Sequence, residues 1–553
     1  MNTGTCDRRW QTLTTLVVLI TAIVLSARPI DDVDIFWQIR IGQLILAHGF
    51  DLTEQLCYRH LSEPMIWVGW LGQVVFASVH RAAGWDGVQA LHVLVYAAAI
   101  GLVFRRMQVA GASVRAALLA LAMMVAACLS NCSERPQTFA FCAFAALLLA
   151  GEGNWPAWRY WGLAVPLLLL WQNLHPSVTL AIAVWGLQAV GGHVDVVAGR
   201  HTRARCESRR PSWKPWQRPL ATAVVAACAV FCTPAGPGIL SISSRNAQIA
   251  RWLGIGEWQP AYVMFAATFG FWMMLLAMAV LWLWGRPRLA WREILPVLVL
   301  TVAALGCARM VVFWALLCAP TLARLLDSVL RVHPKTLESH RRDAGATRVL
   351  GCTVSSPRAD VVPARDGGVM SPAGRRCWQV AWVAAVGLLV MASPWVRPTL
   401  RWLPESRRGL FDPQFPTAGL QHLRGAVGAG RIYNYREWGG LLSFLGAPYW
   451  QVAIDGRIYG HDRATWQSYA AVALGHDEYL RVFERDRPTA LFLHPHHDRG
   501  LIERVRLDAN WYDLYHDANC HIFISRKNAP VPADWFSEVA ARGDRGVGKA
   551  RGE

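Results

Sequence analysis

Three carboxylates, Asp31, Asp32 and Asp34, stand directly after the first apolar run of the chain. That run, residues 11–27, is close to the roughly 20 residues that a membrane-spanning helix needs. Acids at the mouth of such a helix are costly to hold near a bilayer, so they usually have a function or at least a partner. Carboxylates so placed could act as a general base or bind a hard cation. The alternative is a solvated loop whose aspartates cap the following helix.

Four further polar groups interrupt the apolar part of the chain. They are Glu134-Arg135-Pro136, Asn173-Leu174-His175-Pro176, Gly256-Glu257-Trp258 and Arg309. Each has a structural explanation when taken singly. The two arginines can reach lipid headgroups with their long side chains. The histidine–proline pair can close a turn between helices, and the glutamate can lie in a solvated loop.

The composition is that of a membrane protein. Of 553 residues, 54% are hydrophobic and only 17% are charged, and there are 28 tryptophans. Long uncharged apolar runs with Trp at their ends are typical of membrane spans. The net charge of +18 would suit a nucleic-acid-binding protein. However, the basic residues cluster in a few polar stretches between apolar runs, as in cytoplasmic loops, which argues against nucleic acid as a partner.

Eleven apolar runs are candidate membrane spans. They lie at residues 11–27, 86–104, 113–130, 136–150, 159–174, 176–192, 219–233, 261–284, 291–307, 310–326 and 377–395. The acidic stretch follows the first run at once, so we expect an uncleaved first span instead of a signal peptide. Residues 70–83 form an amphipathic segment that we expect to lie along the membrane interface.

Arginine and lysine recur after every second span, which assigns those connections and the N-terminus to the cytoplasm. The intervening connections, beginning with a first external loop at residues 28–69, are then external. All five polar groups fall in external connections. Polar groups that share one depth indicate a site at the external mouth of a helix bundle. An odd number of spans also places the C-terminal part outside.

The sequence therefore predicts a mainly α fold, a polytopic helical membrane bundle of about 11 spans, with a small C-terminal α/β domain outside the membrane. The bundle covers residues 1–326, and a basic, flexible cytoplasmic loop covers 327–376. The last span, 377–395, leads to the external domain at 404–527, where strand-like and helix-like runs alternate. Residues 528–553 are expected to be disordered.

Two motifs of the external domain have competing interpretations. Asp455-Gly456-Arg457 follows a predicted strand, where it is either a structural turn held by an Asp–Arg pair or a ligand-binding loop. The structural turn is the favoured interpretation. His494-Pro495-His496-His497-Asp498 could bind a metal, but no second cluster matches it, so a surface loop is favoured.

The order of these motifs resembles the GT-C superfamily of membrane glycosyltransferases, which take a sugar from a polyprenyl-phosphate carrier at the external face of the membrane. Protein O-mannosyltransferases and oligosaccharyltransferases belong to this superfamily. Its shared mark is an acidic pair or Asp-x-Asp in the first external loop, which Asp32-Val33-Asp34 resembles. The chain is most similar to an uncharacterised bacterial group of this type. Its recurring features resemble Asp32-x-Asp34-x-x-Trp37 with Gly42, Trp67 with Trp70-Leu71, Arg135-Pro136, Asn173-Leu174-His175, Pro234-x-Gly236, Glu257-Trp258, Arg309, Trp438-Gly439-Gly440 and Asp455-Gly456-Arg457.

The chain departs from that group at two places. Relatives often carry His where Gln38 stands, and a His-Glu pair where this chain has Val68-Gly69. No second ionisable group is therefore expected at those positions.

The resemblance implies transfer of a hexosyl or pentosyl unit from a polyprenyl-phosphate-linked sugar to a hydroxyl of a glycan, lipid or protein, with inversion at the anomeric carbon. Asp32 or Asp34 is the candidate general base. The candidate ligands of the donor phosphate are Arg40, Arg135, His175 and Arg309. Further site candidates are Asp31, Trp37, Asn173 and Glu257. If the acids instead bind Mg²⁺ or Mn²⁺, as in oligosaccharyltransferases, then Asp32, Asp34 and Glu257 would supply the oxygen ligands.

The implied location is the bacterial cytoplasmic membrane, with the C-terminal domain on the periplasmic side. Two non-catalytic alternatives are a transporter or flippase of lipid-linked sugars and a membrane scaffold whose external domain binds glycan. A transporter should place ionisable residues near the bilayer midplane and show repeated halves. Here the acids lie at the external mouth and no two-fold repeat is apparent, which favours the enzyme.

Overall fold

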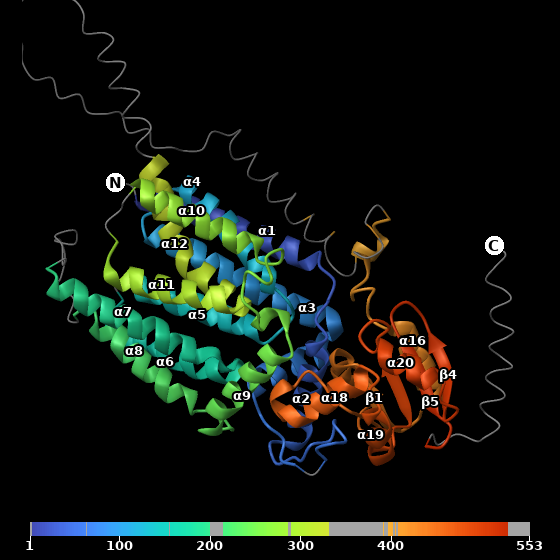
Figure 1. The fold of residues 1–553 in the computed structure, drawn as a ribbon. Coiled ribbons are helices and arrows are strands. Elements are labelled where there is room, and N and C mark those ends of the chain that lie inside the picture. Colours follow the sequence, from blue (N-terminus) through green and yellow to red (C-terminus); the bar gives the residue numbers. More distant parts are fainter. Residues whose placement is uncertain are drawn as a thin grey trace, which may run out of the picture.

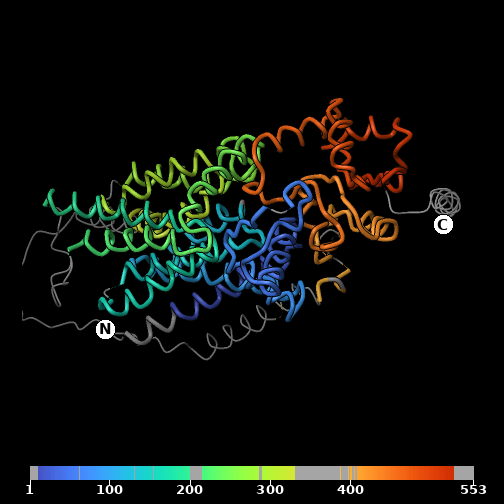
Figure 2. The backbone as a smooth tube through the Cα atoms, turned by 90° about the horizontal axis from the view of Figure 1, so that it is seen from below, coloured from blue at the N-terminus to red at the C-terminus, as the bar shows by residue number. Residues whose placement is uncertain are grey.

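The computed structural model describes residues 3–61, 63–153, 155–199, 214–285, 289–330, 387, 391, 396–401, 404 and 408–528. These residues form a helical bundle with a smaller domain at one end (Figure 1), so that the molecule is elongated when it is seen from below (Figure 2). Of the predicted loop at 327–376, only residues 327–330 are described. Of the predicted span at 377–395, only residues 387 and 391 are described, and of the predicted disordered tail only residue 528.

Ten of the described helices build the bundle. They are α1 (Thr3–Ser26), α3 (Trp70–Val109), α4 (Val114–Cys128), α5 (Gln137–Glu152), α6 (Ala157–Leu174), α7 (Thr179–Val197), α8 (Gln217–Val230), α10 (Phe269–Gly285), α11 (Trp291–Gly306) and α12 (Val311–Leu330). Three helical stretches are long and apolar enough to cross a membrane: Trp70–Val109, Pro176–Val197 and Ala308–Leu330. Five shorter apolar helices accompany them among the described residues. The number of spans beyond these three stays a prediction.

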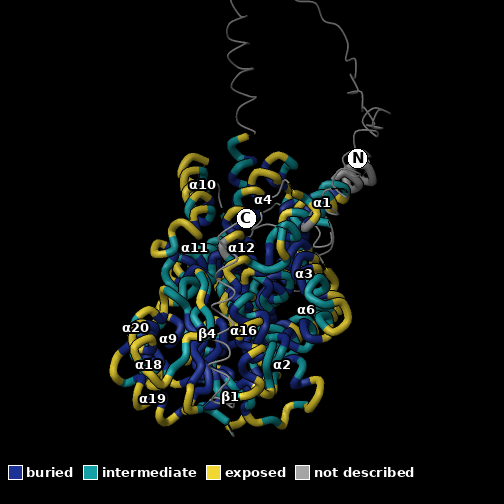
Figure 3. Tube along the Cα trace, turned by 90° about the vertical axis from the view of Figure 1, so that its right-hand side faces the viewer, coloured by how far each residue is buried: buried dark blue, intermediate teal, exposed yellow. Residues whose placement is uncertain are grey.

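The core of the bundle runs along α12, where Trp314, Leu316 and Cys318 are almost completely inaccessible. Buried residues accordingly concentrate in the interior of the bundle, while outer helices such as α10 have exposed residues (Figure 3). On α10 these include Leu276, Leu283 and Trp284. Such exposed apolar side chains suit a helix that faces lipid. The predicted span at 261–284 is shorter than expected, because α10 begins only at Phe269 and residues 261–268 form turns.

The amphipathic segment expected at residues 70–83 is the first part of α3. The backbone leaves helical geometry at Gly84 (φ 61°, ψ −157°), so a kink separates this part from the apolar remainder of the helix. Its Phe76 and Ala77 are buried against α2 (Asp34–His48), a helix inside the first loop, residues 28–69. The two helices can approach closely because Gly42 has no side chain. A Cβ at this position would lie 2.1 Å from the carbonyl oxygen of Gln73.

The connections of the bundle carry short helices. Four 3₁₀ turns mark its helix ends: η1 (Leu129–Asn131), η2 (Pro176–Val178), η3 (Gly256–Trp258) and η4 (Ala308–Met310). The connection at residues 233–260, which the sequence predicts to be an external loop, contains the amphipathic helix α9 (Gly238–Trp252).

The C-terminal domain is built on a five-stranded sheet of order β2-β1-β3-β5-β4. β1 (Gly430–Asn434) pairs in parallel with β2 (Trp450–Val452) and β3 (Ala490–Leu493), while β5 (His521–Ser525) runs antiparallel to β3 and to β4 (Trp511–His516). The accompanying helices are α16 (Thr417–Ala426), α17 (Gly439–Gly446), α18 (Arg463–Ala473), α19 (Glu478–Asp486) and α20 (Arg499–Arg506). The sequence predicts strand-like runs at residues 431–435, 451–454, 490–493 and 521–524, and β1, β2, β3 and β5 lie there, whereas β4, α16 and α19 were not predicted.

The first loop, at residues 28–69, joins the bundle to this domain. Phe36 and Ile39 of α2 share one apolar cluster with Trp438 and Leu441 at the start of α17. Cys57, farther along the loop, forms an isolated parallel bridge with Val452 of β2. The first loop is therefore held between the two parts of the molecule.

Candidate active site

The centre of the candidate site is Arg135, in the loop between η1 and α5. Its guanidinium contacts three carboxylates. Asp32 accepts hydrogen bonds from both Nε and Nη2 of this arginine. Nη2 also lies 3.2 Å from Oδ2 of Asp34, and Nη1 donates to Oε1 of Glu257 at 3.1 Å. Residues from three separate connections thus meet at one side chain.

Arg309, in the 3₁₀ turn before α12, extends the network. Its Nη1 donates to Oε1 of Glu257 at 2.6 Å, and its guanidinium carbon lies 5.2 Å from the centre of the Trp258 ring. Its Nη2 lies 3.3 Å from Nε2 of His175. Arginine has no acceptor, so Nε2 of the imidazole must accept, and Nδ1 then carries the proton toward Oγ of Ser177 at 2.9 Å. Burial and the charges of both arginines hold the pKa of His175 well below its usual value, in agreement with a neutral ring.

The start of α2 explains how the two aspartates are oriented. Asp32 precedes the helix, and its Oδ1 accepts from the backbone N–H of Asp34 at 2.9 Å. Asp34 is the first residue of α2, where the helix dipole favours a negative charge. Trp37, one turn later, donates from Nε1 to Oδ1 of Asp34 at 3.0 Å. The spacing Asp-x-Asp-x-x-Trp is thus the spacing of a helix start.

The two aspartates are in different electrostatic states. Burial alone would raise the pKa of Asp32, but the charge and hydrogen bonds of Arg135 outweigh it and lower this pKa. Burial dominates at Asp34 and, with the nearby charge of Asp32, raises the pKa to about 6 despite the charge of Arg135. The side chain of Asp32 is 2% exposed and that of Asp34 is 26% exposed. Asp34 is therefore the more accessible and the more basic carboxylate.

Two glutamates flank this pair. Burial opposes ionisation of Glu257, but Arg309 and Arg135 outweigh it and lower its pKa, so Glu257 is an ionised link between the two arginines. Glu134 is buried, and its Oε2 has no hydrogen-bond partner among the described residues. Burial and the charge of Asp31 raise the pKa of Glu134 to about 8, which makes it a neutral acid at pH 7. The sequence analysis assigned Glu134 no role of its own.

Three of the other candidate residues lie apart from the network. Arg40 donates to Oε1 of Gln43 at 3.3 Å and to the carbonyl oxygen of Ala447 at 3.4 Å. Asp31 pairs with Arg28 at 3.2 Å near the surface.

Asn173 joins helices: its Oδ1 accepts from Nε1 of Trp70 at 2.6 Å, and its Nδ2 donates to the carbonyl oxygens of Leu169 and Cys232.

The C-terminal domain reaches the candidate site through Gly456. A Cβ on this residue would lie 2.2 Å from Oδ1 of Asp34 and 2.8 Å from Nε1 of Trp37. Only glycine allows so close an approach. The loop after β2 therefore forms one wall beside Asp34, a contact that the sequence analysis did not foresee.

A buried ion cluster holds this loop in place. Arg457 donates from Nη1 to Oε2 of Glu54 at 2.6 Å, and from Nε to Oδ2 of Asp455 at 2.8 Å. The favoured structural interpretation of Asp455-Gly456-Arg457 thus agrees with the Asp–Arg pair, and the added partner is a glutamate of the first loop. Burial opposes ionisation of Glu54 and Asp455, but Arg457 outweighs it and lowers both pKa values.

The side chains of Cys57, Asp455 and His461 lie within 4.8 Å of one another, and these residue types can ligate zinc. However, Nη2 of Arg457 lies 2.7 Å from Oδ2 of Asp455 and 3.5 Å from Sγ of Cys57. A cation there would meet that guanidinium. Burial also raises the pKa of Cys57 well above its usual value, which keeps the thiol protonated.

The same test applies to the cation site suggested for Asp32, Asp34 and Glu257. All three carboxylates are paired with the one guanidinium of Arg135. Mg²⁺ or Mn²⁺ could bind them together only by displacing that arginine. The described arrangement therefore does not suit a cation.

No protein-family model matches the chain. No curated protein matches its sequence. Among solved structures, the chain is similar to ArnT from Cupriavidus metallidurans bound to undecaprenyl phosphate, with 16% identity and a TM-score of 0.49 over 96% of this chain and 100% of that one. It is also similar to the oligosaccharyltransferase AglB from Archaeoglobus fulgidus in complex with an inhibitory peptide and a dolichol-phosphate, with 12% identity and a TM-score of 0.47 over 95% of this chain and 75% of that one. Because these TM-scores lie below 0.5, we base the functional proposal on the site itself.

Proposed function

We propose that this chain is a membrane glycosyltransferase of the GT-C type, which transfers a sugar from a polyprenyl-phosphate carrier to an acceptor hydroxyl at the external face of the cytoplasmic membrane. The observation that carries the proposal is the junction of Asp34, Arg135, Glu257 and Arg309 in one network. It supplies a basic carboxylate and a cationic group, which are the two requirements of transfer from a lipid phosphate.

Asp34 is the general base in this proposal. Its pKa of about 6 leaves it ionised at neutral pH and basic enough to accept a proton from a hydroxyl as that hydroxyl attacks. Asp32 acts as a positioning residue, because its two oxygens hold Arg135. The sequence left Asp32 and Asp34 equivalent, whereas their exposure and pKa values favour Asp34.

Arg309 is the favoured ligand of the donor phosphate. A guanidinium has five N–H donors, and Arg309 directs Nη1 to Glu257 and Nη2 to His175. Its side chain is 20% exposed, so donors remain for phosphate oxygens. Arg135, by contrast, is engaged by three carboxylates. The stacked ring of Trp258 fixes the plane of the Arg309 guanidinium.

The reaction is a single displacement. The acceptor oxygen forms a bond to the anomeric carbon while its proton passes to Asp34. The bond between that carbon and the phosphate oxygen breaks, and its electron pair stays on the polyprenyl phosphate, where Arg309 stabilises the charge. Attack from the face opposite the phosphate inverts the anomeric centre.

The test is sugar transfer from radiolabelled polyprenyl-phosphate sugars by the purified chain in lipid nanodiscs. We expect transfer by the wild type and a loss of at least a hundredfold in Asp34→Asn, since general-base catalysis contributes about 10²–10⁴-fold. Asp31→Asn is the matched control and should retain activity. Full transfer by Asp34→Asn would reject the assignment. Loss of activity in EDTA and recovery with Mn²⁺ would favour the metal-dependent alternative. No transfer by the wild type with any donor would favour the transporter or the scaffold.

A further inference from the structure

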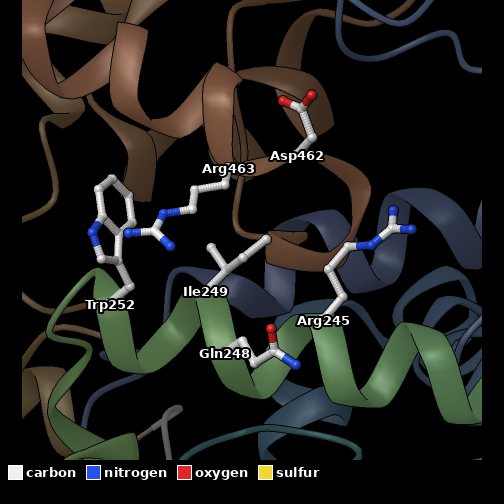
Figure 4. Close-up of a pocket in the computed structure, with 6 residues that line it drawn as sticks. All are labelled: Arg245, Gln248, Ile249, Trp252, Asp462 and Arg463. Atoms are coloured by element: carbon white, nitrogen blue, oxygen red, sulfur yellow. The ribbon is translucent and has the colours of Figure 1, made fainter.

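A pocket of about 340 Å³ lies between the amphipathic helix α9 and the start of α18 in the C-terminal domain. Six residues line it: Arg245, Gln248, Ile249, Trp252, Asp462 and Arg463. Figure 4 shows α9 beneath the pocket, with Asp462 and Arg463 above it. The volume is at the lower end of the range of about 300–1,000 Å³ for small-molecule sites. The pocket thus has room for one end of a glycan or for a small polar ligand.

The four lining residues of α9 occupy positions i, i+3, i+4 and i+7, so they share one face of the helix. Ile249 is buried, whereas Gln248 and Trp252 are exposed and offer an amide and an indole to the pocket. A saccharide uses such groups, because its hydroxyls bind an amide and the apolar face of a sugar ring packs on the face of an aromatic ring.

The charge of the pocket favours an anion. No ion pair joins Arg245 or Arg463 to a carboxylate of the described residues. Asp462 is already engaged as the N-cap of α18, where its Oδ1 accepts from the backbone N–H of Thr465 at 2.8 Å. Arg463 lies over the ring of Trp252, with 5.4 Å between its guanidinium carbon and the ring centre. Two arginines against one capping aspartate leave a net charge of +1 for the ligand to neutralise.

Both walls of the pocket continue into the segments that hold the candidate active site. After α9 the chain turns back, with the N–H of Ile255 donating to the carbonyl oxygen of Ala250 at 3.0 Å, and enters η3 with Glu257. On the other wall, the loop at residues 455–462 begins beside Asp34 at Gly456 and ends in the pocket at Asp462. Each wall of the pocket is thus joined to the candidate site by a few residues of chain.

We propose that this pocket binds an anionic saccharide, carrying a phosphate or a carboxylate, and that it holds the acceptor of the transfer reaction. The acceptor role rests on the proposed function, whereas binding of the anionic saccharide does not. The anionic group pairs with one of the two arginines, whose guanidinium groups lie at opposite ends of the pocket in Figure 4, and Gln248 and Trp252 recognise the sugar ring.

The experiment is isothermal titration calorimetry of the full chain in nanodiscs of phosphatidylcholine, with glucose 1-phosphate, glucuronic acid, glucose and inorganic phosphate as probes. We expect glucose 1-phosphate or glucuronic acid to bind at least tenfold more tightly than glucose or inorganic phosphate. The double variant Arg245→Gln/Arg463→Gln should lose at least tenfold in affinity. Arg251→Gln removes an exposed arginine of α9 that does not line the pocket, and it should bind as the wild type does.

Several outcomes would overturn the proposal. One is that the double variant binds the probes as tightly as the wild type does, at an unchanged melting temperature. Another is that Arg251→Gln loses as much affinity as the double variant. A third is that inorganic phosphate binds as tightly as the sugar phosphate. Competition by phosphatidylglycerol would identify a lipid headgroup as the ligand and would likewise overturn it. Asp34→Asn and Arg309→Gln should keep the binding, which separates this pocket from the donor site. If the wild type binds the probes but transfers no sugar, the proposed function fails while the anion site stands.

Discussion

Substitution of the two aspartates should change stability in opposite directions. Asp34→Asn should melt at a higher temperature than the wild type at pH 8, although it loses transfer. Asp32→Asn should melt at a lower temperature. The reason is that Asp34 is ionised at a cost in the folded chain, whereas Asp32 is stabilised as a carboxylate by Arg135.

The magnitude follows from the pKa values. Folding raises the pKa of Asp34 from 3.8 to about 6, which corresponds to about 3 kcal/mol between the two protonation states. The folded chain binds this proton more tightly than the unfolded chain. Wild-type stability therefore falls as the pH rises from about 4 to about 6 and remains lower above that. Asparagine resembles the protonated acid, so Asp34→Asn recovers at most about 3 kcal/mol at pH 8 and nothing near pH 4.

Folding changes the pKa of Asp32 in the opposite direction. Its pKa is lower in the folded chain, so its carboxylate stabilises the fold above the ordinary pKa and that contribution is lost as the pH falls. Asp32→Asn removes the bidentate partner of Arg135 inside the protein, a change that costs about 3–5 kcal/mol for a buried pair.

Thermal unfolding of both variants in nanodiscs, at pH 8 and pH 4.5, measures these differences. Asp31→Asn is the control, because Asp31 lies near the surface with Arg28 as its partner. If Asp34→Asn melts at a higher temperature than the wild type at pH 8 but not at pH 4.5, the result supports a raised pKa of Asp34 in the folded chain. If Asp34→Asn melts as far below the wild type as Asp32→Asn does, then Asp34 is a structural partner of Arg135 and not a strained base.

Three further predictions test other parts of the same arrangement. Because Asp34 must be ionised to act as a base, kcat/KM should fall tenfold for each pH unit below about 6, and a pH–rate profile that stays flat to pH 5 would exclude this role. Gly456→Ala places a Cβ 2.2 Å from Oδ1 of Asp34 and should reduce transfer at least tenfold, whereas Gly428→Ala, which meets nothing within 4 Å, should leave the rate unchanged. Glu54→Gln leaves the buried Arg457 with one carboxylate partner, so it should lower the free energy of unfolding by about 3 kcal/mol, as measured in denaturant. A loss below about 1 kcal/mol would mean that the remaining carboxylate is a sufficient partner for Arg457.

The helices of the bundle could be predicted because their signal is local. An apolar run of sufficient length has few alternatives to a buried or lipid-facing helix. α9 was missed because its apolar positions are separated by serine, arginine and glutamine, so it does not read as a span. β4 was missed because the strand is an edge strand whose residues are partly or fully exposed, which leaves no apolar run to detect.

The candidate site was only partly predictable, because only part of its signal is local in the sequence. Its polar residues interrupt apolar runs, and the alternation of basic loops assigns them to one side, so their convergence could be expected. Which carboxylate each arginine contacts depends on distances between helices, which no local pattern contains. Glu54 and Arg457 are 403 residues apart, and the sequence around each gives no reason to pair them. Gly456 looks like any turn glycine until Asp34 is placed against it.

The contacts of the first loop bear on the role of the C-terminal domain. Arg457 holds Glu54, and Arg59 holds Asp486 at 2.8 Å, with all four side chains nearly inaccessible to solvent. Removing one partner of such a pair leaves an uncompensated charge inside the protein, so these pairs resist separation of the loop from the domain. Within the same loop, α2 begins with Asp34, whose carboxylate is confined between Trp37 and Gly456. The domain therefore supplies one wall of the candidate site and also fixes the segment that carries its base, which makes it a part of the site as much as the bundle is.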